Sequence, residues 1–452
     1  MLSKRSKVSV RVHSHAYLAA AAVASFVSAY LLYLGWETAA LGTVTFAVFC
    51  YPFASFFDRI VFDGKRLRRT GIPWRLLALA TGRPIRVKPH RIVHVDTEAT
   101  RIFRRGPNVA YFYRTSLHAD DISFRVASGR GYRELISTVL PLIPDGCLDL
   151  RSLELRDHFK DAFEVRERAR SLHIPAGDVL DTGTILVKPD VLSSETAPRT
   201  DSNEIERSNE LRTVANQLRA NGRLVQSFEA FRRAHRLMPQ NARLIYEFAR
   251  CLQSLAAAKH DSKLERRSRA MMRIAERRSG NDADLLSLLG ETYFSVGSWR
   301  RAENAFKRAA ETGNAGYRIF RGLGELALRD GKIAHAINYF ARSAEVAKPP
   351  SLFRWARSEA DYLRHLNDDE EYMELEIGRI NLYDTFDSAR STSIKIFCFG
   401  LFVIALGLVS YENVITDIGW AVSGISLLIW LASSLLKQSF ASRIPFELLD
   451  KK

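Results

Sequence analysis

Residues 289–309 read LGETYFSVGSWRRAENAFKRA, and residues 323–343 read LGELALRDGKIAHAINYFARS. At an offset of 34 residues, both stretches place glycine, small and aromatic residues at the same positions. The first set is Gly290, Tyr293, Gly297, Ala302, Phe306 and Ala309, and the second is Gly324, Ala327, Gly331, Ala336, Phe340 and Ser343. Such a period predicts stacked helix pairs, because one amphipathic pair cannot bury its apolar stripe alone.

The same pattern extends toward the N-terminus. One earlier unit contains Ala215, Leu218, Gly222, Ser227, Phe231, Ala234 and Pro239, and the next contains Phe248, Ala249, Leu252, Ser268, Met272 and Ala275. The series resembles the tetratricopeptide repeat (TPR). We expect glycine to end the first helix of each pair and an aromatic residue to fill the helix crossing. The predicted core residues are Leu286, Leu289, Phe306, Phe320, Leu323 and Phe340.

The TPR resemblance implies a partner-binding groove lined by the first helix of each pair. Transferred position by position, its residues are Asn209, Arg212, Asn216, Arg219, Arg243, Tyr246, Arg250, Gln253, Asp284, Glu291, Phe294, Arg318, Arg321 and Glu325. The first half is basic, which favours an acidic segment or a terminal carboxylate as ligand. Asn216 with Arg212 is similar to the carboxylate-clamp subgroup, but Glu247 departs from its pattern. The alternative is that these side chains are ordinary solvated helix faces.

Four apolar segments, 16–36, 38–57, 394–411 and 418–436, are each about twenty residues long. A helix of that length crosses about 30 Å of hydrocarbon, so we expect two transmembrane hairpins. A cleavable signal peptide is the alternative for the first segment. The cations Lys4, Arg5, Lys7 and Arg11 precede the first hairpin, and Arg59 and residues 65–69 follow it. By the positive-inside rule, both termini and the central region are expected to be cytoplasmic.

Residues 58–150 predict a small α+β domain. Segments 59–62, 85–88, 92–95, 109–113 and 122–126 read as short strands, and residues 132–142 as a helix. With pieces such as RLRRTG at 66–71 and RIVHVD at 91–96, the region resembles bacterial PH-like domains, which implies a bacterial plasma (inner) membrane. Some other small α+β domain is the alternative, and residues 74–83 could form a short interfacial helix. Its cations either face an anionic lipid surface or are ordinary solvated residues that flank the membrane segment. They are Lys65, Arg66, Arg68, Arg69, Arg83, Arg86 and Lys88.

These segments predict a multi-domain membrane protein with an all-α TPR solenoid. The expected parts are a tail and hairpin (1–57), the PH-like α+β domain (58–150), a charged helix at 153–172 with a linker (151–205), repeats with a capping helix at 353–377 (206–385), and a second hairpin with a tail (386–452).

No motif of a catalytic centre stands out in the sequence. His90 and His94 lie on an expected strand, where their spacing does not define a metal-binding face, and Glu154 with Asp157 reads as surface charge pairing. We therefore predict a membrane-anchored cytoplasmic scaffold that binds a protein, without catalysis, cofactor or metal. The formal charge of +16 also suits an anionic partner. The alternatives are a membrane-bound enzyme or enzyme regulator and a nucleic-acid-binding membrane protein; homo-oligomerisation stays open.

Overall fold

The computed structural model describes residues 7–12, 15–71, 75, 79, 86–102, 109–119, 122–177, 179–180, 202–313 and 315–440. Most of the expected helix at 74–83 and of the linker, together with Arg83, lies outside these residues. The chain divides into two compact units. The first unit comprises Met1–Ala20, Val48–Leu323 and Arg342–Ala356, and the second comprises Ala21–Ala47, Gly324–Ala341 and Arg357–Lys452.

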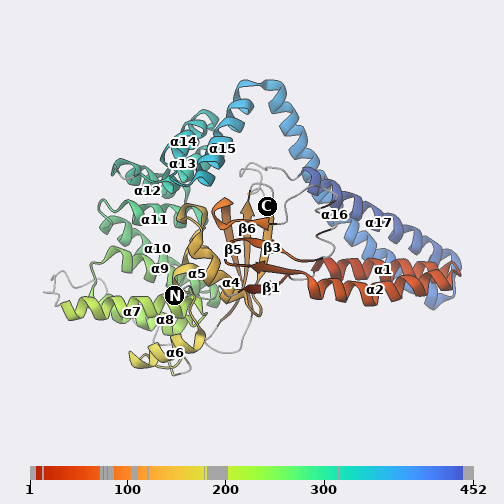
Figure 1. Cartoon of the computed structure of the whole chain (residues 1–452), viewed down its shortest axis with the longest axis horizontal. Coiled ribbons are helices and arrows are strands. Elements are labelled where there is room, and N and C mark those ends of the chain that lie inside the picture. The colour runs from red at the N-terminus through yellow and green to blue at the C-terminus, as the bar shows by residue number, and fades with distance from the viewer. Residues whose placement is uncertain are drawn as a thin grey trace. The chain divides into compact units, whose positions relative to one another are not determined.

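Two antiparallel sheets lie in the first unit (Figure 1). One has the order β1 (Val8–Arg11), β2 (Arg59–Phe62), β3 (Leu67–Arg69) and β4 (Arg86–Val87), and the other is β5 (Ile92–Ile102), β6 (Ala110–Ala119) and β7 (Ser123–Ala127). Strand β1 falls in the segment expected to be an N-terminal tail. After β1 the chain forms α1 (His15–Tyr33) and α2 (Glu37–Phe57), then returns so that Arg59 pairs with Arg11. The first apolar hairpin is thus inserted between two neighbouring strands.

Short helices follow the sheets, namely α4 (Tyr132–Val139), α5 (Leu150–His158) and α6 (Ala162–Ser171), with 3-10 turns η1 (Pro89–Arg91), η2 (Leu140–Leu142) and η3 (Asp145–Cys147). The prediction of a single charged helix over residues 153–172 is therefore wrong, because two helices, α5 and α6, occupy this segment. Asp149 caps α5 by accepting from the Ser152 amide at 2.8 Å, and Asp161 caps α6 by accepting from the Phe163 amide at 2.8 Å. Because Asp favours the N-cap, Asp161 starts a new helix instead of continuing the old one.

The expected helix pairs are present. They are α7 (Ser202–Ala220) with α8 (Leu224–Leu237), α9 (Ala242–Lys259) with α10 (Ser262–Arg278), α11 (Ala283–Ser295) with α12 (Trp299–Glu311), and α13 (Tyr317–Arg329) with α14 (Ile333–Val346). Gly222, Gly297 and Gly331 occupy the turns with φ of +76°, +74° and +71°, a backbone region that favours glycine. All six predicted core residues are at most 3% exposed.

The sheets and the repeat helices share a hydrophobic core in the first unit. Phe124 and Leu135 of the α+β region belong to the same buried cluster as Tyr317 and Leu352, the latter on α15 (Pro350–Asp368). Backbone contacts join the two regions as well, since the Val109 amide donates to the Gly222 carbonyl at 2.9 Å. The sheet region and the repeat helices of the first unit are therefore packed against each other.

The second unit contains two long helices, α16 (Glu370–Ser410) and α17 (Asn413–Phe440), which form an antiparallel hairpin. Asp369 caps α16, so the expected capping helix at 353–377 is broken there, and the expected boundary at 385/386 falls inside one continuous helix. No proline interrupts residues 370–410, which explains the continuity. Within the same unit, Trp420 packs against Phe26 and Tyr30 with ring centroids 5.2 and 5.3 Å apart, so the two hairpins touch.

Three helices of the described chain are long and apolar enough to span a membrane, judged by length and composition. They are Glu37–Phe57, Glu370–Ser410 and Asn413–Ser434. The first expected span also forms a helix, but its apolar part, Ala20–Tyr33, is shorter. The chain is thus compatible with membrane association.

Candidate functional site: the repeat groove

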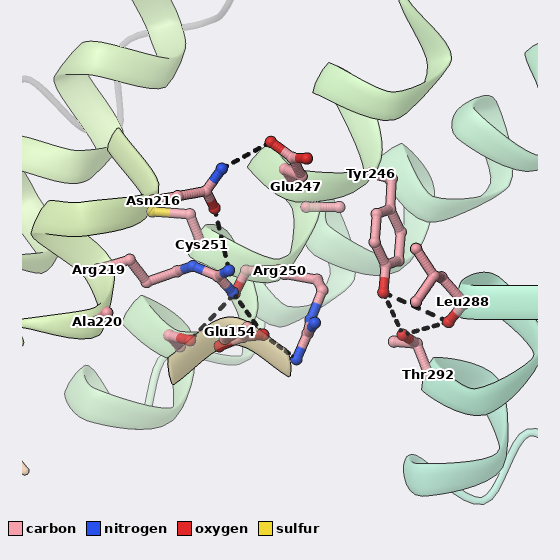
Figure 2. Close-up of polar contacts among 12 residues, drawn as sticks. Glu154, Asn216, Arg219, Ala220, Tyr246, Glu247, Arg250, Cys251, Leu288 and Thr292 are labelled. Carbon is pink, nitrogen blue, oxygen red and sulfur yellow. Dashed lines mark hydrogen bonds and ion pairs between the residues drawn. The ribbon is translucent and has the colours of Figure 1, made fainter. Parts of the chain in front are cut away.

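A helix of the same chain lies against the groove predicted from the repeats. Helix α5 contacts α7 and α11, both first helices of their pairs. From α5, the Glu154 carboxylate reaches Arg219 of α7 at 3.3 Å and also pairs with Arg250 of α9 (Figure 2). The three side chains are only 11%, 7% and 14% exposed. Two arginines of the predicted groove therefore hold an acidic residue from within the chain.

The electrostatics of Glu154 follow from these neighbours. Burial by itself would raise the pKa of Glu154, but Arg219, Arg250 and Arg151 outweigh it and lower that pKa to about 2. Burial would lower the pKa of Arg250, and Glu154 outweighs it to give a raised pKa. Glu154 and Arg250 are thus both charged at neutral pH, which is tolerated in a buried site because each has a partner of opposite charge.

A second cluster lies around Glu247 on α9. Asn216 donates its side-chain amide to the Glu247 carboxylate at 2.7 Å, and Arg212 and Arg243 lie 3.5 and 3.7 Å from the same carboxylate. Arg219 also donates to the Asn216 carbonyl oxygen at 3.1 Å, which joins this cluster to that of Glu154 (Figure 2). Glu247, the residue that departs from the carboxylate-clamp pattern, thus accepts from Asn216 and forms ion pairs with Arg212 and Arg243, the side chains that would otherwise hold a ligand.

Further along the groove the expected residues are again paired within the chain. Arg318 donates twice to Glu291, at 2.7 and 2.6 Å, and once to the Leu148 carbonyl at 3.2 Å. Tyr246 shares a hydrogen bond of 2.9 Å with Thr292. Arg318 consequently ties the repeat to the segment that precedes α5.

The structure does not bring every expected residue into this cluster. Asn209 is exposed and lines a separate hollow of about 630 Å³ between α6 and α7. The Phe294 ring packs on Trp299 at 5.1 Å, and the Arg321 guanidinium lies 5.3 Å from the Trp355 ring centroid. Gln253 and Glu325 are each partly buried.

A polar cavity of about 270 Å³ remains between α5 and the repeat helices. The repeat side contributes Asn216, Arg219, Arg243, Tyr246, Glu247, Arg250, Asp284, Ser287, Leu288 and Arg318. The facing side contributes residues that sequence reasoning did not assign to the groove, namely Asp145, Leu150, Leu153, Glu154, Arg156, Asp157 and His158. Seven of the predicted groove residues thus line one cavity, namely Asn216, Arg219, Arg243, Tyr246, Arg250, Asp284 and Arg318. No local sequence signal indicated the residues on its opposite wall.

The chemistry of this cavity is that of recognition by charge and hydrogen bonding. Ser287 and His158 each have a buried polar side-chain atom without a hydrogen-bond partner in the structure. Among the described residues, no group of three or more His, Cys, Asp and Glu side chains could hold a metal ion.

No protein-family model and no curated protein sequence matches the chain. A solved structure described as "Functional Characterization of Pseudomonas Aeruginosa pilF" aligns with 53% of this chain and 99% of its own length, at 19% identity and a TM-score of 0.32.

Proposed function

We propose that this protein is a membrane-anchored scaffold or adaptor whose TPR-like groove binds a protein partner at the cytoplasmic face of a bacterial plasma membrane. The apolar helices supply the anchor, and the flanking cations favour cytoplasmic termini. In this proposal the two sheets, of four and three antiparallel strands followed by α4, form a PH-like domain.

The observation that carries the proposal is the complementarity of the groove arginines to a carboxylate on a helix. Arg219 and Arg250 hold the Glu154 carboxylate of α5, so the groove side chains are already arranged to bind a carboxylate on a helical ligand. Arginine forks bind carboxylates with defined geometry, and helices that lie in a groove are a common mode of peptide recognition. The partner would bind in the cavity that remains beside α5, next to Asn216 and Arg243.

Site-specific photocrosslinking in native membranes tests this surface. A benzoylphenylalanine at Arg243, whose side chain is 51% exposed in the groove, should capture a discrete protein. The matched control is Arg269 on α10, which belongs to the second helix of its pair and is 60% exposed. The groove proposal predicts an adduct at Arg243 that is absent at Arg269.

The charge preference is tested on the same adduct. Arg243→Glu, combined with a crosslinker at Asp284, an exposed residue that lines the same cavity, should lower capture of an acidic partner, because a like charge then faces its carboxylates. Equal adducts at Arg243 and Arg269, or an adduct only at Arg269, would show that the groove is not the recruiting surface.

A further inference from the structure

Two arginines face each other where the apolar helix α2 passes into the sheet. Arg11 of β1 and Arg59 of β2 are direct cross-strand partners. Their guanidinium carbons lie 4.3 and 5.4 Å from the centroid of the Phe56 ring, at the end of α2. Like charges directly opposite on a sheet repel each other, so this pair is unfavourable unless an anion lies near it.

The neighbouring acid does not supply that anion. Asp58 is completely buried, and it accepts from Tyr17 of α1 at 3.0 Å and from Nε of Arg69 at 2.8 Å. The Asp58 carboxylate therefore already has partners in Tyr17 and Arg69. Within the described part of the chain, neither Arg11 nor Arg59 forms an ion pair.

The position of the pair corresponds to the edge of an apolar layer. Arg59 follows the last residue of α2 by two positions. Phe53, Phe56 and Phe57 are 56%, 48% and 45% exposed, and their rings contact one another at 4.6 and 5.5 Å. Exposed aromatic residues and cations at the end of a spanning helix are typical of the level of lipid headgroups.

We propose that Arg11 and Arg59, resting on Phe56, form a binding site for the phosphate of an anionic phospholipid headgroup. Guanidinium groups bind phosphate through paired hydrogen bonds, and a bound phosphate removes the repulsion between the two strands. Phe53 and Phe57 offer an apolar surface for the upper acyl chain. The site rests on the proposed membrane anchoring, and it is independent of the repeat groove.

Lipid titration of the full chain tests the site. The protein in mild detergent is titrated with phosphatidylglycerol or with phosphatidylcholine of the same acyl chains, and retained lipid is counted by native mass spectrometry. We expect preferential retention of phosphatidylglycerol. At about 1 kcal/mol for each cation, Arg11→Gln with Arg59→Gln should weaken it about 30-fold, and each single change about fivefold.

The control removes the same charge elsewhere. Arg266→Gln with Arg277→Gln on α10 should leave phosphatidylglycerol retention within about twofold, and the melting temperature of each variant verifies its fold. Equal loss in both double variants, or no loss at Arg11 and Arg59, overturns the site. Millimolar inorganic phosphate should not displace the lipid; displacement at matched concentration would reassign the site to free phosphate.

Failure of the anchoring gives a different result. If alkaline carbonate releases the wild-type chain from membranes without detergent, the proposed anchor is wrong. If the chain stays in the membrane but shows no preference for phosphatidylglycerol, the headgroup site alone is wrong.

Discussion

Replacing Glu154 by glutamine should destabilise the first unit by about 3 kcal/mol. The pKa of Glu154 is about 2 in the folded chain, against an ordinary value of 4.5. A shift of that size corresponds to about 3 kcal/mol at about 1.4 kcal/mol for each pH unit. Breaking a buried ion pair by removing one partner costs about 3–5 kcal/mol, because the remaining charges stay buried, so the two estimates agree.

Urea unfolding of the full chain in detergent, followed by circular dichroism, measures this loss. The control is Glu164→Gln on α6, where Glu164 and Arg168 form an i,i+4 pair and are 48% and 51% exposed. That change should cost less than about 0.5 kcal/mol. The sign of the pH dependence follows from the lowered pKa: the Glu154 contribution is complete above pH 4.5 and is lost as pH falls toward about 2.

Replacing the whole charged cluster by apolar residues distinguishes the cost of an unpaired buried charge from the cost of lost packing. Changing Glu154 to Leu together with Arg219 and Arg250 to Met should be far less harmful than Glu154→Gln alone, since no unpaired charge remains. A loss below about 1 kcal/mol for Glu154→Gln, or a loss no larger than that of the surface control, would refute the view that this cluster holds α5 in the groove.

Other changes test the packing and a partly buried histidine, His94. At Gly222 an added Cβ would lie 1.9 Å from the Val109 carbonyl oxygen, whereas at Gly331 nothing lies within 4 Å; both have positive φ, so Gly222→Ala should lower the urea midpoint clearly more than Gly331→Ala. Gly290→Ala should cost about 1–3 kcal/mol by overpacking the adjacent phenylalanine, and an unchanged urea midpoint would contradict the close crossing. Burial lowers the pKa of His94 to about 3, so the contribution of the neutral imidazole to stability is present above pH 6.5 and is lost as pH falls toward 3. His94→Leu should therefore reduce the fall in unfolding free energy between pH 7 and 5.5. An identical pH dependence in both proteins would refute this.

The repeat helices could be predicted because their signal is local and recurs. Gly290 and Phe306 are sixteen residues apart in the sequence, and the same spacing returns at Gly324 and Phe340. An added Cβ on Gly290 would lie 2.7 Å from the Phe306 ring, and one on Gly324 would lie 3.0 Å from that of Phe340. The recurring spacing therefore indicates a contact between two neighbouring helices. One glycine and one phenylalanine in each repeat are enough to make that contact recognisable in the sequence.

The partner of the groove arginines could not be predicted, because it comes from a distant segment. Glu154 reads as a solvated charge on a helix rich in Arg and Glu, but it is buried against α7 and α9. Strand β1 was missed for the same reason. Its four residues pair with β2 only after two apolar helices have intervened, and a short run such as Val8–Arg11 carries no mark of a partner about fifty positions away.

The placement of β1 before the first apolar hairpin also restricts how the chain threads through a bilayer. Since Arg11 and Arg59 are ladder partners, the chain leaves the sheet before α1 and returns to it after α2 at points one strand spacing apart, about 5 Å. Because both ends of this segment are held at the same side of the membrane, the segment must cross the lipid an even number of times. The two helices, of 19 and 21 residues, therefore cross together or not at all, and a lone passage by α2 is geometrically forbidden while the ladder holds.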